Sequence, residues 1–149
     1  MKLLIQRVNK ASVKIDNKEI AHIGKGLLIF IGLCKDDTEK MFDKVIKKIL
    51  TLRIFHDKNN KMNKSILDIN GEILIVSQFT LCATIKSGTR PSFSSALEPK
   101  KAKELYEKFV YMFNTKYPMV KTGKFGAYMQ IELVNDGPVT FMLEFTRKL

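Results

Sequence analysis

The stretch Leu27-Leu28-Ile29-Phe30-Ile31-Gly32-Leu33-Cys34 decides the fold of this chain. It is the longest apolar run in the sequence, and its length suits a strand but is far too short for a membrane-spanning helix. Because no charged residue interrupts the run, neither face of the strand can be left to solvent. The run therefore predicts a central strand in a sheet that is covered on both faces.

The segment after this strand has the pattern of an amphipathic helix. Thr38 is a suitable N-cap, and Asp36 and Asp37 place negative charge near the expected helix N-terminus. Apolar side chains then recur at i, i+3, i+4, i+7 and i+8: Phe42, Val45, Ile46, Ile49 and Leu50. These residues share one face of a helix, so we expect that face to pack on the sheet.

The remaining sequence adds strands, loops and one more long helix. Strands are expected over 1–8, 11–15, 18–23, 52–55, 72–78, 127–134 and 139–145, with turns at 9–10, 121–126 and 135–138 and loops over 56–64 and 84–95. Pro99 suits the first turn of a second helix, which should end near Tyr117-Pro118. The sequence thus predicts an α+β fold: a single domain over residues 1–149, with a largely antiparallel β-sheet or barrel and two main helices.

Charge is the unusual feature of the composition. The 149 residues include 26 Lys+Arg and 15 Asp+Glu, which gives a formal net charge of +11. The excess is spread along the chain, so the positive field belongs to the folded body, and such a body attracts RNA, DNA or an anionic membrane surface. The alternative is a lysine-rich proteome in which these charges only solvate the surface. Both interpretations apply to the lysines opposite the apolar helix face: Lys40, Lys44, Lys47 and Lys48.

Cysteine and histidine usage gives little support to metal chemistry. The two cysteines, Cys34 and Cys82, do not make a disulfide framework, and the N-terminal residues turn polar too soon for a signal peptide. The histidines, His22 and His56, are far apart and belong to no cluster with metal-ligand spacing. We therefore expect a cytoplasmic protein with no membrane partner, no metal and no cofactor.

Polar residues interrupt apolar strands at two places. Ser77-Gln78-Phe79-Thr80-Leu81 ends a buried strand with two hydroxyls and an amide, and Asn135-Asp136-Gly137-Pro138-Val139-Thr140 lies between two strands. Ordinary turn chemistry accounts for either cluster, since these residue types satisfy nearby backbone groups. A Gly-Pro bond can also be cis at modest cost, which turns its carbonyls in an unusual direction. Both motifs are therefore candidates for a functional site as well as for plain turns.

At these two motifs the chain closely resembles the D-aminoacyl-tRNA deacylase family. The resemblance covers essentially the whole chain, because other matching segments run in order between residues 6 and 140. They are Gln6-Arg7-Val8, Ala11-Ser12-Val13, Gly26-Leu27-Leu28, Arg53-Ile54-Phe55, Lys61-Met62-Asn63, Arg90-Pro91-Ser92-Phe93 and Thr122-Gly123-Lys124-Phe125-Gly126-Ala127. The five-residue motif SQFTL and the six-residue motif NDGPVT are jointly very specific.

The resemblance implies a hydrolase that cleaves the ester between a D-amino acid and the 3′-terminal adenosine of tRNA, in translation quality control. It also implies removal of glycine from mischarged tRNA(Ala). The implied partners are aminoacyl-tRNA, contacted at its terminal adenosine and acceptor stem, and a second copy of the chain in a homodimer. Two rival classes stay open on the residues alone: a non-catalytic RNA-binding module, and an esterase or thioesterase for small molecules.

The resemblance also assigns residues to the substrate pocket. Ser77, Gln78 and Phe79 should line one side of it. Phe79, Phe125 and Met129 are expected to pack around the terminal adenosine, since unpaired bases stack on aromatic surfaces. Ordinary core packing is the alternative for these three residues.

Chiral selection is implied at Gly137 and Pro138. In the family, the matching residues form a cis dipeptide that reaches into the partner's pocket, where two parallel carbonyls leave no room for an L side chain. Glycine is not excluded by that geometry. Arg7 is expected to brace this turn, and an exposed strand arginine is the alternative.

Two catalytic schemes fit the motif around Thr80. A Thr80 nucleophile would need a nearby base, and none is close in sequence. In the other scheme the ribose 2′-hydroxyl beside the ester helps to activate water, while the backbone N–H groups of Phe79 and Thr80 stabilise the developing oxyanion. The resemblance favours the second scheme. Cys82 has no partner histidine in view, so we interpret it as a buried small residue.

Overall fold

The apolar run of the sequence forms β3 (Gly26–Gly32), a central strand of a six-stranded sheet. The order is β2 (Lys18–Ile23), β1 (Lys2–Ile15), β3, β6 (Glu72–Ser77) and β7 (Val120–Thr122), and β8 (Gln130–Glu144) also pairs with β1. β1 is antiparallel to β2, β3 and β8, whereas β3, β6 and β7 are parallel. This computed structural model, which describes residues 1–146, confirms the predicted α+β class, with the two parallel pairs as a departure.

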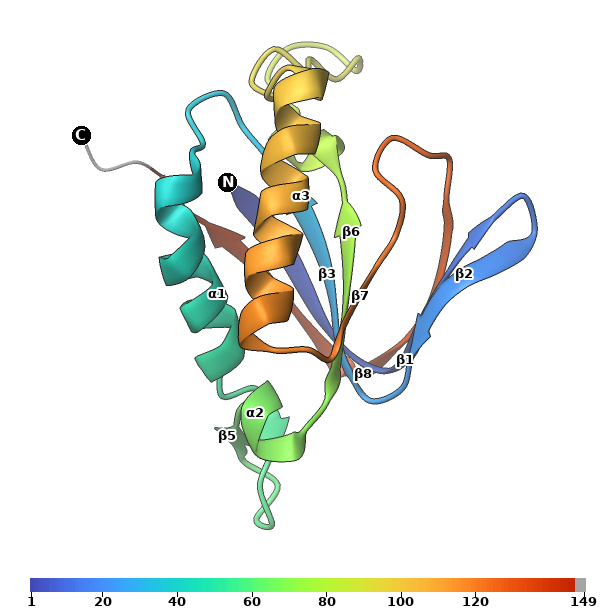
Figure 1. Cartoon of the computed structure of the whole chain (residues 1–149), viewed down its shortest axis with the longest axis vertical. Coiled ribbons are helices and arrows are strands. Elements are labelled where there is room, and N and C mark those ends of the chain that lie inside the picture. The colour runs from blue at the N-terminus through green and yellow to red at the C-terminus, as the bar shows by residue number, and fades with distance from the viewer. Residues whose placement is uncertain (147–149) are drawn as a thin grey trace.

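Both faces of β3 are covered, as the apolar run predicts. Helices α1 (Phe42–Thr51) and α3 (Pro99–Lys116) lie over one face of the sheet (Figure 1). Leu27 and Ile29 belong to the core beneath these helices. Leu28 belongs instead to a second apolar cluster, with Val8 and Leu74, because alternate residues of a strand point to opposite faces.

The two predicted main helices are confirmed. All five predicted apolar residues of α1 are buried, and the Phe42 ring packs edge-to-face on Phe109 of α3 with centroids 5.2 Å apart. A short 3-10 turn, η1 (Glu39–Met41), precedes α1, and Thr38 lies at its N-cap without a side-chain capping bond. Pro99 occupies the first turn of α3, and Tyr117 caps its end. No helix within residues 1–146 is both long and apolar enough to cross a membrane.

Two expected turns are instead parts of continuous strands. β1 runs through Asn9 and Lys10, because it pairs with β8 along its length and absorbs these residues at a register shift. β8 likewise runs through the segment expected as a turn. Its ladder passes from Gln6↔Thr140 to Val8↔Asn135, so residues 136–139 bulge out of the pairing. The bulge, rather than a strand break, positions the Gly137-Pro138 pair.

The structure contains several short elements that the sequence did not predict. β4 (Phe55–His56) and β5 (Met62–Lys64) pair as a small hairpin where a strand over 52–55 and a loop were expected. α2 (Ile66–Ile69) follows with a capping box in which Ser65 and Asp68 bond reciprocally. β7 lies where a turn was expected, and it is set by parallel pairing with β6. Such short segments are too short to have a hydrophobic period from which they could be predicted.

The two cysteines are linked. Cys34 lies just beyond β3, Cys82 is the last residue of the 3-10 turn η2 (Phe79–Cys82), and their Cα atoms are 5.9 Å apart with the sulfur atoms bonded. Cys82 is buried, as expected, but it is not free. A single bond is no disulfide framework, but the pairing could not be predicted from the sequence, because Cys34 and Cys82 are 48 residues apart.

Glu72 joins the two edges of the curved sheet. Its carboxylate accepts a bond from the Gly24 N–H at 3.0 Å, after β2, and lies 3.3 Å from the Lys121 amino group of β7. Lys121 also donates to the His22 carbonyl at 2.8 Å. The Gly24 N–H, with help from Lys121, holds the pKa of the Glu72 carboxyl below its usual value.

We predict that Glu72→Gln weakens the fold in a pH-dependent way. A depressed carboxyl pKa contributes stability above the unfolded value, near 4.5, and that contribution is lost as the pH falls through the folded pKa. The variant should therefore unfold at lower urea than the parent at pH 7, and the gap should close in acid. Glu132→Gln, which removes an exposed ion pair with Lys14, serves as the control. A gap that does not change with pH would contradict this assignment.

Candidate active site

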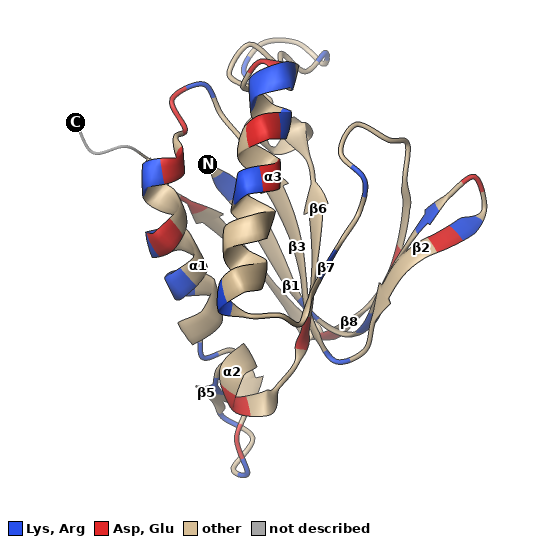
Figure 2. Ribbon diagram, viewed as in Figure 1, with Lys and Arg blue, Asp and Glu red and all other residues tan. Residues whose placement is uncertain are grey.

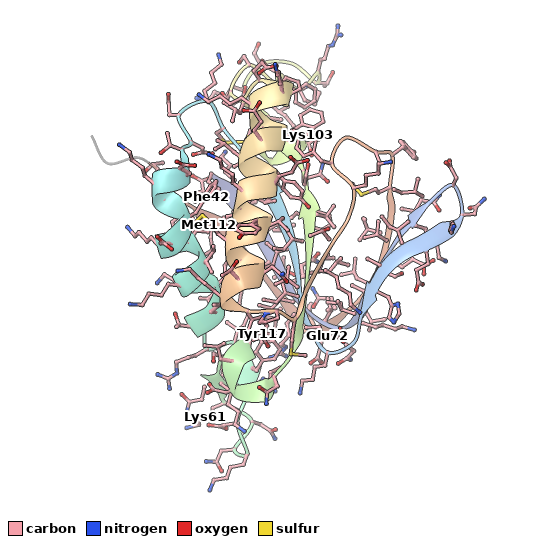
Figure 3. The ribbon with its side chains drawn as sticks, viewed as in Figure 1. Phe42, Lys61, Glu72, Lys103, Met112 and Tyr117 are labelled. Atoms are coloured by element: carbon pink, nitrogen blue, oxygen red, sulfur yellow. A yellow bond between two sulfur atoms is a disulfide. The ribbon has the colours of Figure 1, made fainter. Side chains whose placement is uncertain are left out.

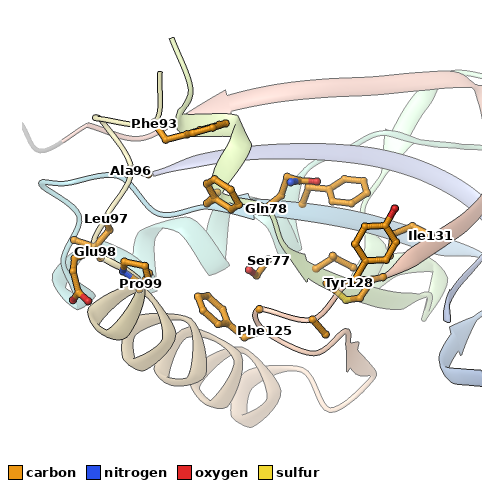
Figure 4. A pocket seen from close by; sticks show the side chains of 17 residues that line it. Ser77, Gln78, Phe93, Ala96, Leu97, Glu98, Pro99, Phe125, Tyr128 and Ile131 are labelled. Carbon is orange, nitrogen blue, oxygen red and sulfur yellow. The ribbon is translucent and has the colours of Figure 1, made fainter. Parts of the chain in front are cut away.

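Residues predicted to contact the substrate gather at one cavity. The cavity has a volume of about 620 Å³ and lies beside the end of β6, between η2, the start of α3 and the segment after β7 (Figure 4). All five predicted pocket residues line it: Ser77, Gln78, Phe79, Phe125 and Met129. Two segments separated by nearly fifty residues therefore form one site, because β6 and β7 are neighbours in the sheet.

Aromatic rings form much of the wall. Phe79 and Phe93 pack edge-to-face with centroids 5.0 Å apart, and both rings stay about half exposed. On the opposite side the Phe125 ring lies 5.6 Å from that of Tyr106, whose hydroxyl donates to the Ile75 carbonyl. Exposed aromatic faces in a hollow suit a stacked, unpaired base.

Gly123 leaves room for the tight loop that places Met129 in the cavity wall. The Met129 sulfur accepts a bond from the Lys124 N–H at 3.4 Å, which closes the loop between β7 and β8. A Cβ atom on Gly123 would lie 2.7 Å from that sulfur. A side chain at position 123 would therefore displace Met129 from the cavity wall.

Two consecutive backbone N–H groups in η2, one of them from the lining residue Phe79, have no acceptor within residues 1–146. In η2 the Leu81 N–H donates to Gln78 and the Ala83 N–H to Thr80, as 3-10 bonds reach back three residues. The N–H groups of Phe79 and Thr80 precede this pattern, and no bond from them occurs in residues 1–146. The Gln78 N–H is held by the Ile31 carbonyl at 2.8 Å. The strand end thus ties down Gln78 and leaves the next two donors open.

The Thr80 side chain does not line the cavity. Thr80 is exposed on η2, whereas its neighbour Phe79 lines the hollow. Of the two candidate catalytic residues, the structure thus brings the Phe79 side chain to the site and leaves the Thr80 hydroxyl outside the lining.

The cavity is poor in ionisable groups. Among the described residues that line it, Glu98 is the only carboxylate, and there is no histidine, lysine or arginine. Glu98 caps α3, and the backbone N–H groups of Lys100 and Lys101 hold the pKa of its carboxyl below the usual value. A carboxylate stabilised in this way is a weak base at neutral pH. Within residues 1–146 no cluster of three or more His, Cys, Asp or Glu could hold a metal ion.

Glu98, Phe93 and Tyr128 are among the lining residues that sequence reasoning missed. Glu98 and Phe93 come from the long loop before α3, and Tyr128 follows the Thr122–Ala127 motif. Phe93 lies within a quoted match, Arg90-Pro91-Ser92-Phe93, so that match was the available signal. Tyr128 is 91% exposed at the cavity, which marks it as a side chain without a packing role.

Arg7 is a buried strand arginine, not an exposed one. It is 3% exposed, and its guanidinium donates to the Asp136 carbonyl at 3.0 Å and to the Ile54 carbonyl at 2.8 Å. The Asp136 carboxylate lies 3.5 Å from Nε. Arg7 thus fills the space inside the bulge of residues 136–139 and links it to the segment before β4.

The Gly137-Pro138 bond is cis, and the pair is exposed away from the chain's own cavity. Asn135 holds the base of the bulge by accepting a bond from the Val139 N–H at 2.7 Å. Gly137 has φ +139°, and a Cβ atom there would lie 2.7 Å from the Val139 side chain and 3.1 Å from Arg7. Only glycine fits this position without strain.

One family model matches nearly the whole chain. The model described as D-Tyr-tRNA(Tyr) deacylase covers residues 4–144, which include the cavity and the bulge. The chain belongs to this family. Similar curated proteins include the D-aminoacyl-tRNA deacylases of Persephonella marina and a Sulfurihydrogenibium species. They are 54% and 55% identical over 141 residues, which is 95% of this chain and of each relative.

Solved structures agree on the fold. A structure titled "c-Myc DNA Unwinding Element Binding Protein" is 41% identical, with a TM-score of 0.93 over 98% of this chain and 99% of that one. A structure titled as a probable eukaryotic D-amino acid tRNA deacylase has a TM-score of 0.85 over 95% of this chain and 97% of that one, at 17% identity. The latter likeness shows the fold alone. The family's fold, predicted from the motifs, is thereby confirmed.

We predict that Arg7→Met destabilises the protein by about 2 to 4 kcal/mol, because the buried carbonyls of Ile54 and Asp136 lose their donor. Urea unfolding followed by circular dichroism measures the loss. Arg53→Met is the matched control, since Arg53 is exposed and bonds only to Asn63 at the surface. Equal stability losses in the two variants would contradict the bracing contact.

Proposed function

We propose that this chain hydrolyses the ester of D-aminoacyl-tRNA and releases the free D-amino acid and tRNA, which removes wrongly charged tRNA from translation. The observation that carries the proposal is the family match over residues 4–144, with relatives of the same length named D-aminoacyl-tRNA deacylase. We take residues 1–149 as one deacylase domain. The aromatic cavity supports the proposal, since it has the size and apolar lining expected of a nucleoside pocket.

The chemistry we propose uses backbone groups and the substrate itself. With the terminal adenosine in the cavity beside Ser77, Gln78, Phe79, Phe125 and Met129, the ester carbonyl faces the free N–H groups of Phe79 and Thr80. These donors stabilise the oxyanion that forms when water attacks the carbonyl carbon, and one such donor is worth about 3 kcal/mol. The ester bond then breaks, and the ribose oxygen leaves with a proton.

The proton of the attacking water is the critical one in this scheme. The lining lacks a histidine, and Glu98 is committed to the α3 N-terminus with a lowered pKa. A threonine nucleophile would need a base that the described lining does not offer, and the Thr80 hydroxyl lies outside it. We therefore infer that the neighbouring ribose 2′-hydroxyl assists the attack, and that the protein contributes position and hydrogen bonds.

Chiral selection in our proposal comes from a second copy of the chain. Gly137 and Pro138 project from the sheet and do not line their own cavity. Three apolar side chains on β8 are also exposed, namely Val134, Phe141 and Met142. A homodimer that covers them would carry each Gly137-Pro138 pair to the partner's cavity. There backbone carbonyls reject every L side chain by clash, whatever its chemistry.

The same chiral filter would also accept a glycyl ester. A wall that excludes L side chains has nothing to clash with in a glycyl ester, so glycyl-tRNA(Ala) is a second proposed substrate. The rigid support of the bulge by Arg7 and Asn135 is consistent with a filter made from backbone.

Charge brings the RNA to this site. Lys and Arg residues are distributed along many parts of the ribbon (Figure 2), including the start of α3, which borders the cavity. The net charge of +11 attracts the acceptor stem without regard to sequence. The cavity itself takes no part in this attraction, since it is nearly uncharged.

Three substrates test the proposed function together. Incubated with D-tyrosyl-tRNA, L-tyrosyl-tRNA and a free D-tyrosine ester, the protein should cleave only the first at a useful rate, measured as release of labelled tyrosine. A non-catalytic RNA-binding module would bind both RNAs and cleave none. A small-molecule esterase would cleave the free ester, and equal cleavage of the D and L tRNAs would overturn the chiral filter.

A further inference from the structure

A second hollow adjoins the active-site cavity. It is a groove of about 670 Å³ between α3 and residues 120–125. Phe125 lines both hollows, so it lies where they meet. The charged and aromatic residues of the groove that matter here are Lys103, Glu107, Tyr111, Lys121 and Lys124.

Two of the three lysines are available to a ligand. Lys121 is already bonded to Glu72 and to the His22 carbonyl. Lys103 has only Glu107 nearby, at 3.9 Å with both side chains about 60% exposed, and such a pair is weak in water. Lys124 is exposed and forms no ion pair within residues 1–146. The groove therefore presents two exposed ammonium groups, one weakly paired and one unpaired in the described residues, against one acid.

An exposed aromatic ring lies on the same side of α3. Lys103, Glu107 and Tyr111 follow one another at i, i+4 and i+8, which places them in one row on the helix. Tyr111 is 74% exposed and stacks on no other aromatic ring in the described part of the chain. Lysines beside an exposed aromatic ring are the usual composition of a groove for single-stranded nucleic acid, in which cations follow the phosphates and rings stack on bases.

We propose that this groove binds the sugar-phosphate backbone of the unpaired nucleotides that precede the terminal adenosine. The proposal rests on the proposed function. If the terminal adenosine occupies the cavity, the nucleotides that precede it must run across the rim of the cavity. The groove begins at Phe125, on that rim, and the exposed ammonium groups of Lys103 and Lys124 complement phosphate charge. Lys103 and Lys124 bind the phosphates, and Tyr111 offers its ring to a base.

Binding of RNA without an ester isolates this groove from the chemistry. We would measure the affinity of a fluorescent hairpin with a single-stranded 3′ CCA end, across a salt series, by anisotropy. Lys103→Ala with Lys124→Ala should weaken binding about tenfold at 0.1 M salt and lower the slope of log K against log salt by about 1.4, since each single-strand phosphate contact contributes about 0.7. A hairpin without the 3′ extension should show no such difference.

The matched control is a pair of lysines far from the groove. Lys58 and Lys61 are exposed in the β4–β5 hairpin, and Figure 3 shows Lys61 at the opposite end of the molecule from Lys103. Lys58→Ala with Lys61→Ala removes the same net charge. An equal loss in both double variants, or no loss in either, would overturn the groove, because only diffuse charge would then act.

Hydrolysis separates this proposal from the proposed function. The groove variant should lose more kcat/KM on D-aminoacyl-tRNA than on a D-aminoacyl-adenosine, which has no preceding phosphates, and the loss should lie mainly in KM. If the unaltered protein cleaves neither ester but the groove variant still loses RNA affinity, the proposed function fails and the groove stands. If the protein cleaves D-aminoacyl-tRNA and the variant matches the control pair, the groove fails alone.

Discussion

The Arg7 guanidinium is buried at a break in the β1–β8 ladder. Its hydrogen bonds are the interaction on which the arrangement of the strands in this protein depends. β1 pairs with β2, β3 and β8, so any change in its register moves three strands at once. At Arg7 the β8 ladder skips residues 136–139, and the guanidinium donates to Asp136 on one side and to Ile54 on the other. An unpaired cation buried there would be costly, so these bonds hold the bulge at one position.

The sequence predicts the regular parts of this structure well, because their apolar periods are long. The face of α1 and the buried strand β3 follow from such periods, and Pro99 and Tyr117-Pro118 mark the limits of α3. The strands β1 and β8 are longer than expected, because Asn9-Lys10 and Asn135–Pro138 have turn composition while partner strands keep them in register. β7 and the Cys34–Cys82 bond depend on neighbours distant in sequence, which no local pattern reveals.

The site, like the fold, combines residues that could be predicted from the sequence with residues that could not. The five pocket residues were predicted from motif resemblance, and they line one cavity because β6 and β7 are adjacent. Composition and spacing alone would have left Ser77–Leu81 as turn chemistry. Glu98 and Tyr128 were missed, since a helix cap and an exposed tyrosine carry no catalytic signature in sequence. The open N–H groups of Phe79 and Thr80 could be identified only from the bonds that surround them.

Charge and chemistry occupy separate parts of the molecule in this account. In our proposals the net charge of +11 and the groove lysines attract phosphates, whereas the nearly uncharged cavity holds the nucleoside beside the free N–H groups of η2. An enzyme built in this way leaves the activation of water to its substrate. Catalysis in this scheme therefore depends on a hydroxyl group of the substrate, which the protein does not carry.

The most direct test replaces that hydroxyl. Single-turnover hydrolysis would be compared for D-aminoacyl-tRNA that ends in adenosine and in 2′-deoxyadenosine, at enzyme concentrations that bind both fully. If the 2′-hydroxyl assists the attack, its removal should slow ester cleavage at least about 100-fold, the scale of a lost acid–base group. Unchanged cleavage of the deoxy substrate would contradict the account and point to a nucleophile or base on the protein.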